Sequence, residues 1–185
     1  MKDLETKNLN IRRFKLSDVE DVHKNLATEK QLEECLGYHV HSNLEETRMM
    51  VSSYIKEYDM NALAWAIEEK SSNKVIGYIN ALEVSMINKR CDIKFGIAFD
   101  WLEKGLMEEA LICVLDYLFN IRKFNIVTSY FFDGYPKIAK IKREILEKVG
   151  MRQDAILRNR QINEKSGVAE NKVIYSILKE EFKRI

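Results

Sequence analysis

The stretch Phe99-Asp-Trp-Leu-Glu-Lys-Gly-Leu-Met-Glu-Glu-Ala110 decides how this chain is expected to fold. It begins where the strand-like run 91–99 ends, and it leads into residues 108–119, whose apolar side chains recur at the spacing of a helix. Gly105 stands between the two, and glycine adopts backbone conformations that bulkier residues avoid. The sequence therefore predicts a strand, a glycine loop and a helix in direct succession.

The other elements are predicted from periodicity, capping residues and turn residues. Alternating or β-branched runs predict strands at 9–14, 63–68, 74–84, 91–99, 125–132, 151–161 and 172–178. Helices are expected from a capping box at Ser17-Asp-Val-Glu20, from Ser42 or Asn43 towards Tyr58, and at 108–119 and 137–149. The expected order is β-α-α-β-β-β-α-β-α-β-β.

The composition is that of a globular protein. The chain has 185 residues, of which 46% are hydrophobic and 32% are charged, so we expect a single domain over residues 1–185. Lys and Arg number 30 against 29 for Asp and Glu, so no overall positive field exists to hold a nucleic acid or an anionic membrane. A small molecule or a protein is the expected partner.

The cysteines and the N-terminus indicate where the protein works. Cys35, Cys91 and Cys113 are odd in number and have no short paired spacing, which argues against a disulfide framework and against a zinc site. The N-terminus has no apolar signal core, and no stretch approaches the roughly 20 apolar residues needed to span a bilayer. We expect a soluble protein of the cytoplasm.

The order of elements, the stretch 99–110 and Leu146-Glu-Lys-Val-Gly-Met151 together resemble the GNAT acetyltransferases, particularly the branch containing the ribosomal-protein alanine N-acetyltransferases. The likeness covers nearly the whole chain. It implies an α+β GNAT fold, in which a central, mostly antiparallel sheet flanked by helices splays between its middle strands to admit the pantetheine arm of acetyl-CoA. The implied reaction is transfer of an acetyl group, without a metal, to a primary amine of a protein N-terminus or a small molecule. Many family members form homodimers, so a homodimer is possible.

The family loop before the central helix, Gln/Arg-x-x-Gly-x-Gly/Ala, holds the CoA pyrophosphate through backbone N–H groups at a helix start. Here the motif falls on residues 102–107, and only Gly105 stands in its expected place, because Leu102 and Met107 depart from it. Main-chain N–H groups do not depend on side-chain identity, so CoA binding is still expected. The resemblance assigns cofactor contacts to Lys104, Gly105, Leu106 and Met107. The carboxylates of Glu103, Glu108 and Glu109 would oppose the phosphates, and Lys104 offsets part of that charge.

Acetyl transfer also needs a polarised carbonyl, a base and an acid. By the resemblance, backbone N–H groups of Ile97, Ala98 and Phe99 lie on the cofactor side of the splayed strand. Asp92 occupies the place of a glutamate that often acts as base in this branch, and it could act through a water molecule. The alternative is a solvated strand-end carboxylate that pairs with Arg90 or Lys94.

The acid is harder to assign, because the family's Asn-x-x-Ser is missing. Counting back from Glu147 places the motif on Ala139 and Lys142, whereas counting forward from the strand 125–132 places it on Tyr135 and Ile138. Tyr135 precedes Pro136, which is favoured in the first turn of a helix, so its phenol could protonate the leaving thiolate at the cleft mouth. The alternative is surface exposure.

Other readings of the sequence remain open. His39 and His41 share one side of a strand-like run, but no third ligand lies nearby, so histidines of a substrate loop are favoured over a metal site. The divergent loop and the missing Asn-x-x-Ser allow a catalytically weak GNAT-fold module that binds CoA or regulates. A nucleic-acid-binding domain is disfavoured by the near-zero net charge and by the lack of an aromatic-plus-basic sheet motif.

Overall fold

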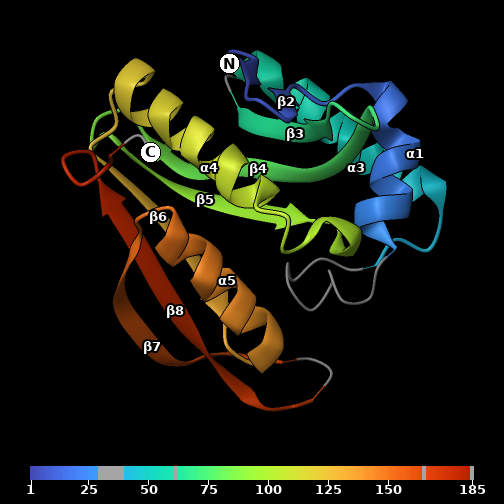
Figure 1. Ribbon diagram of the computed structural model, residues 1–185. Helices are drawn as coiled ribbons and strands as arrows, with labels where there is room; N and C mark the ends of the chain where they lie inside the picture. The colour runs from blue at the N-terminus through green and yellow to red at the C-terminus, as the bar shows by residue number, and fades with distance from the viewer. Residues whose placement is uncertain (29–39, 61, 164–165, 184–185) are drawn as a thin grey trace.

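The computed structural model describes residues 1–28, 40–60, 62–163 and 166–183. Its strands form one eight-stranded sheet in the order β1-β2-β3-β4-β5-β6-β8-β7 (Figure 1). Neighbouring strands are antiparallel except β5 and β6, which are parallel. The strands are β1 (Leu4–Glu5), β2 (Leu9–Arg12), β3 (Leu63–Glu69), β4 (Lys74–Ser85), β5 (Arg90–Ile97), β6 (Ile126–Phe132), β7 (Arg152–Ile162) and β8 (Ala169–Leu178). The expected mostly antiparallel sheet is confirmed, and β1 is an addition to it.

Helices cover the sheet on both faces. They are α1 (Val19–Val22), α3 (Leu44–Glu57), α4 (Leu106–Asp116) and α5 (Pro136–Lys148). Helices α4 and α5 pack on one face, where they share the larger hydrophobic core with most of the strands (Figure 1). Helices α1 and α3 pack on the opposite face, over β3 and β4. The predicted order of helices and strands is confirmed.

The start of the first helix differs from the prediction. The chain turns into a short 3-10 helix at Leu16–Asp18 whose cap is Lys15, two residues before the expected cap Ser17. The carboxylate of Asp18 accepts a hydrogen bond from the backbone N–H of Lys15, at 2.8 Å. Asp18 therefore takes the role that the sequence assigned to Glu20. The prediction for the second helix is confirmed, with Asn43 as its cap: Asn43 Oδ1 accepts from the N–H of Glu46 at 3.0 Å.

The sheet opens between β5 and β6. These strands pair only from Arg90 to Ile93 and from Ile126 to Ser129. Beyond this point β5 stays paired with β4 as far as Ile97, whereas β6 stays paired with β8 as far as Phe132. Because each strand follows its other neighbour, the natural twist of the two half-sheets carries them apart. The splay expected between the middle strands is confirmed.

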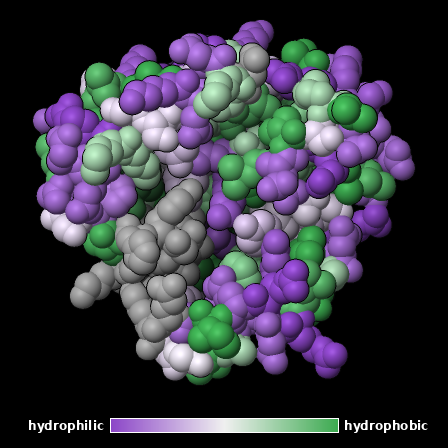
Figure 2. Space-filling model, turned by 180° about the vertical axis from the view of Figure 1, so that it is seen from behind, coloured by the Kyte–Doolittle hydropathy of each residue, from purple (hydrophilic) through white to green (hydrophobic). Residues whose placement is uncertain are grey.

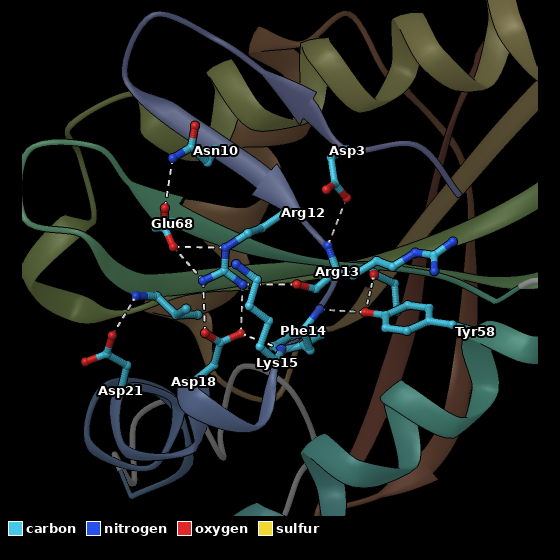
Figure 3. A network of polar contacts seen from close by, with 12 residues as sticks. Asp3, Asn10, Arg12, Arg13, Phe14, Lys15, Asp18, Asp21, Tyr58 and Glu68 are labelled. Atoms are coloured by element: carbon cyan, nitrogen blue, oxygen red, sulfur yellow. Dashed lines mark hydrogen bonds and ion pairs between the residues drawn. The ribbon is translucent and has the colours of Figure 1, made fainter.

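A buried ionic network ties β2 to β3 and to the start of α1 (Figure 3). The guanidinium of Arg12 binds both carboxylate oxygens of Asp18, at 2.8 and 2.9 Å, and its Nε donates to Glu68 at 2.9 Å. Asn10 donates to the other oxygen of Glu68 at 2.8 Å. Burial alone would lower the pKa of Arg12, but the hydrogen bonds to Asp18 and Glu68 outweigh burial and raise it. Arg12 therefore stays charged at every pH at which the fold exists.

We expect acid to weaken this network through Glu68. Burial opposes ionisation of its carboxyl group, but hydrogen bonds from Asn10 and Arg12 and the charge of Arg12 lower its pKa below the ordinary value of 4.5. The ionised group therefore stabilises the fold fully above pH 4.5, and that stabilisation is lost as the pH falls through the lowered folded-state pKa. Urea unfolding from about pH 7 to about pH 3 should show a smaller acid loss in Glu68→Gln than in the parent protein. Equal acid losses would contradict the assignment.

Candidate functional site

The splay between β5 and β6 has two unlike sides. On one side Phe95 and Ile97 of β5 pack into the core shared with α4 and α5. Because side chains alternate along a strand, Asp92 and Lys94 point to the opposite side. A group passing through the splay would reach α4 and α5 at one end and Asp92 at the other.

The loop before α4 has the geometry of an anion site. Gly105 caps the helix with φ +73° and ψ +3°, a left-handed conformation that favours glycine. The N–H of Glu109 closes the first turn on the carbonyl of Gly105, at 3.0 Å. The N–H groups of the first turn have no intrahelical acceptor, and within the described residues no side chain caps this end. Backbone N–H groups and the helix dipole therefore favour a phosphate here.

Two of the three carboxylates near this helix start bind other parts of the chain. Glu108 pairs with Lys148 of α5 at 3.1 Å. Glu109 accepts from the backbone N–H of Asn8 at 3.0 Å and from its side chain at 2.8 Å. Only Glu103, which is exposed and has φ +63°, remains on the loop without such a link among the described contacts. The concern that Glu108 and Glu109 crowd a bound phosphate is therefore reduced by the fold.

Trp101 anchors the same loop. Its indole N–H donates to Glu69, at the end of β3, at 2.9 Å. The ammonium of Lys104 lies 5.3 Å from the centre of the Trp101 ring, within the range of a cation–π contact. Lys104 is thus held beside the helix start with its charge exposed to solvent.

The three residues expected at the splayed end of β5 differ in what their backbones can offer. The N–H of Ala98 is already bound to the carbonyl of Ile76 in β4, at 2.8 Å. In an antiparallel pair successive N–H groups point alternately towards and away from the partner strand, so the N–H of Ile97 points away from β4, towards the splay. Ile97 is therefore the best placed of the three. Phe99 begins a short 3-10 helix, and β5 ends at Ile97, two residues before the expected strand end at Phe99.

Asp92 lies at the base of the splay. It pairs with Leu82 of β4 and with Thr128 of β6, and it is half-buried. Burial raises its pKa, the charges of Arg90 and Lys172 oppose that rise, and Glu83 adds to it. The alternative role for Asp92 was an ion pair with Arg90 or Lys94. Among the described residues, no ion pair involves Asp92. A carboxyl group with a raised pKa suits a general base.

Tyr135 lies at the other end of the splay from Asp92. It is the half-buried cap of α5, with Pro136 as the first helical residue. Thr128, the neighbour of Asp92, precedes the end of β6 at Phe132 by about 13 Å of extended strand. The structure therefore does not bring Asp92 and Tyr135 together.

Lys142 lies beside the splay, which the sequence did not indicate. Its ammonium lies 5.8 Å from the centre of the Phe95 ring. Phe95 belongs to the part of β5 that has left β6, so this contact spans the splay on the α4–α5 side. The sequence had placed Lys142 in one of two motif registers. Only the approach of α5 to β5 sets it beside the splay.

His23 and His41 form a small polar cluster at Thr47 of α3. Nδ1 of His23 and Nδ1 of His41 lie 2.7 and 2.9 Å from the buried hydroxyl of Thr47. Burial lowers the pKa of His41, Glu46 opposes the change and His23 adds to it. His39 and Cys35 lie outside the described residues. Among those that are described, no group of three or more histidine, cysteine or acidic side chains could hold a metal ion.

The described helices also include none long and apolar enough to cross a membrane. The cysteines within the described part, Cys91 and Cys113, form no disulfide bond there. Burial, with a smaller effect of Asp92, raises the pKa of Cys91 to about 12, so this thiol is unreactive at neutral pH.

Comparisons with known proteins agree with this geometry. The model of the acetyltransferase (GNAT) domain matches residues 8–152. A GNAT-family acetyltransferase from Bacillus anthracis superposes with a TM-score of 0.79 at 20% identity, covering 97% of this chain and 100% of that one. A ribosomal-protein-S5-alanine acetyltransferase from Vibrio fischeri has a TM-score of 0.81 at 13% identity, covering 99% and 100%. No curated protein sequence matches the chain significantly.

A further solved structure shows a related protein with coenzyme A. It is a ribosomal alpha-N-protein acetyltransferase in complex with CoA, with a TM-score of 0.79 at 16% identity, covering 96% of this chain and 98% of that one. At these identities a structural likeness shows the fold alone. The splayed sheet and the helix-start loop are those expected of an acyltransferase that uses a CoA thioester. The family match is decisive: the chain belongs to the GNAT acetyltransferases and is an enzyme of that kind.

Proposed function

We propose that this enzyme moves the acetyl group of acetyl-CoA to a primary amine, either a protein N-terminus or a small amine. The observation that carries the proposal is the position of the Gly105 loop and Asp92 on opposite sides of the splay. The donor supplies an activated thioester, which would lie through the splay with its phosphates at the start of α4. The acceptor would then approach from the side of Asp92. The relatives named as ribosomal-protein acetyltransferases support a protein N-terminus among the acceptors.

Each residue has a proposed role in this reaction. The N–H of Ile97 would polarise the thioester carbonyl, and Asp92 would take a proton from the amine through a water molecule. The amine forms the new bond to the acetyl carbon as the carbon–sulfur bond breaks, and the thiolate needs a proton. Tyr135 is the proposed donor, and Lys142 is its rival because of its place across the splay. Tyr135→Phe and Lys142→Met separate them: the donor variant keeps acetyl-CoA binding and loses turnover.

Calorimetric titration with acetyl-CoA, CoA and a thioester that lacks the nucleotide tests the donor site. Micromolar binding that requires the nucleotide part would support the Gly105 loop and justify an amine panel. Absence of binding at millimolar acetyl-CoA would remove the proposed reaction.

A catalytically weak module that binds CoA or regulates is the second candidate. It is favoured by Leu102 and Met107 in the loop, and by Ala139 and Lys142 or Tyr135 and Ile138 where the family has Asn-x-x-Ser. Binding of acetyl-CoA without turnover on the amine panel would identify it.

Three further features belong to the same proposal. Residues 1–185 would form one domain, because a single sheet runs from β1 to β8. A cytoplasmic location is supported by the free thiol of Cys91. A homodimer is supported by β7, an edge strand of the sheet whose residues are almost all exposed. Light scattering of the purified protein measures the last of these.

Gly105→Ala is expected to weaken CoA binding about fivefold, because a side chain at φ +73° adds about 1 kcal/mol of backbone strain that the loop relieves by moving. The added Cβ meets no atom within 4 Å, so the effect is one of backbone conformation alone. Gly167→Ala is the matched control, with φ +69° and equally open space on the hairpin between β7 and β8. Calorimetry should show weaker binding for the first variant and unchanged binding for the second. The same affinity in both would argue against the loop.

A further inference from the structure

The face of the splay that carries Asp92 also carries a cluster of basic and aromatic side chains. Core residues Val127 and Phe131 of β6, and Val173 of β8, face α4 and α5, so the side chains between them face the other way. Phe132 pairs with Lys172, and Lys94 follows Asp92 by two residues on β5. We call Lys94, Tyr130, Phe132 and Lys172 the Tyr130 cluster. Figure 2 views this side of the molecule, where hydrophilic and hydrophobic side chains are mixed.

Two ammonium groups lie near the ring of Tyr130. The Nζ of Lys172 lies 3.5 Å from the centre of its ring, and the Nζ of Lys94 lies 5.7 Å from the same point. Phe132 packs edge-on against the ring, with centroids 5.9 Å apart and an interplanar angle of 81°. All four side chains are half-buried. Three strands thus converge on one ring with two positive charges.

Neither ammonium group forms an ion pair among the described residues, although Lys172 lies near enough to Asp92 to oppose the rise that burial causes in the pKa of that carboxyl group. Both ammonium groups lie within 6 Å of one ring centroid, so two positive charges share one half-buried neighbourhood. A cation–π contact positions an ammonium group and leaves its N–H donors available. An anion beside the ring would be attracted by both charges.

We propose that the acceptor carries a carboxylate close to its amine, and that Lys94 and Lys172 bind this carboxylate while Asp92 receives the amine. The inference deepens the proposed function and rests on it. The Cα atoms of residues two apart on a strand, such as Asp92 and Lys94, lie about 7 Å apart. An N-terminal amine and the side-chain carboxylate of the next residue span about the same distance. An acidic protein N-terminus and a free acidic amino acid share this chemistry.

A nucleic acid fits the same face less well. The ring face on which a base would stack is covered by Lys172, at 3.5 Å. Glu83 lies near Asp92, because its charge adds to the rise that burial causes in the pKa of Asp92. Two carboxylates would repel a phosphate backbone, whereas they suit a cationic amine. The expectation that the sheet lacks an aromatic-plus-basic motif was wrong. The two acids beside this motif favour an amine, and its two lysines favour a carboxylate.

Steady-state acetylation of matched acceptors tests the inference. The acceptors are a peptide beginning Ala-Asp-Glu, its amide counterpart beginning Ala-Asn-Gln, and free aspartate. We expect Lys172→Met to lower kcat/KM about tenfold for the acidic peptide and less than about twofold for the amide peptide, since a charge-assisted contact is lost only with the first. Lys179→Met, an exposed lysine just after β8, is the control and should change neither value. Free aspartate shows whether an amino acid suffices or a peptide is needed.

The outcomes separate the inference from the proposed function. Turnover with equal losses on both peptides, or a parent preference for the amide peptide, would overturn the inference and leave the acetyl transfer standing. If no acceptor turns over, calorimetry with the acidic peptide in the presence of CoA decides: binding that Lys172→Met abolishes supports the anion site although the reaction fails, and no binding overturns it. Salt-sensitive binding of single-stranded RNA that requires Lys172 would also overturn it.

Discussion

Asp92→Asn is expected to lower kcat about 100-fold while leaving the affinity for acetyl-CoA unchanged, because loss of a general base typically costs two orders of magnitude or more. Asparagine keeps the size of the side chain but cannot accept the proton of the amine. The raised pKa of Asp92, caused first by burial, also places the acid limb of the pH–rate profile above the range of an exposed aspartate. Activity should therefore rise with pH as this carboxyl group ionises.

Two comparisons separate this role from a structural one. Asp92→Glu restores a carboxylate at the place where the related branch often has glutamate, and we expect it to recover most of the activity. In Asp92→Asn the acid limb should disappear from the pH profile of the residual rate. An unchanged kcat, or the same acid limb in the variant, would show that another group is the base.

Arg12→Met is expected to destabilise the fold by about 3 kcal/mol, because it leaves the carboxylates of Asp18 and Glu68 buried without a counter-charge. The three side chains are 11%, 5% and 16% exposed, so water cannot replace the guanidinium. The measurement is the free energy of unfolding from urea titration at neutral pH. The deficit should shrink in acid, as the pH falls through the lowered pKa of Glu68 and its carboxylate takes up a proton.

Arg13→Met is the matched control for this prediction. Arg13 is the next residue and is exposed, with a cation–π contact to Tyr58 at 5.2 Å. We expect its loss to cost less than about 1 kcal/mol, as is usual for exposed charges. Similar costs for both variants would mean that the network of Arg12 contributes little.

Much of the fold could be predicted from the sequence because its signals are local. The run 99–110 predicted the loop and α4, and the helix begins at Leu106, directly after Gly105. Asn43 caps α3 as a residue with a short polar side chain should. The helix start at Ser17 and Glu20 was wrong because Asp18 is recruited by Arg12, a contact that no local pattern contains.

The candidate site was predictable only in part. Gly105 and Asp92 follow from motifs, but the roles of their neighbours depend on distant partners. Glu108 binds a lysine 40 residues away, and Glu109 binds Asn8, 101 residues away. The sequence therefore read both as obstacles to a phosphate, whereas the fold turns them to other tasks.

The sequence by itself determined the order of the elements, the glycine at the helix start and the position of Asp92 on its strand, because periodicity and backbone preference act over a few residues. Only the tertiary structure decided that β5 and β6 part after Ile93, that Lys142 reaches Phe95, and that Lys94 and Lys172 meet on Tyr130. These contacts depend on which strands pair and in which register. Strand pairing is set by the packing of the whole sheet, and a shift of one residue would send the strand side chains Phe95, Lys94, Tyr130 or Lys172 to the other face.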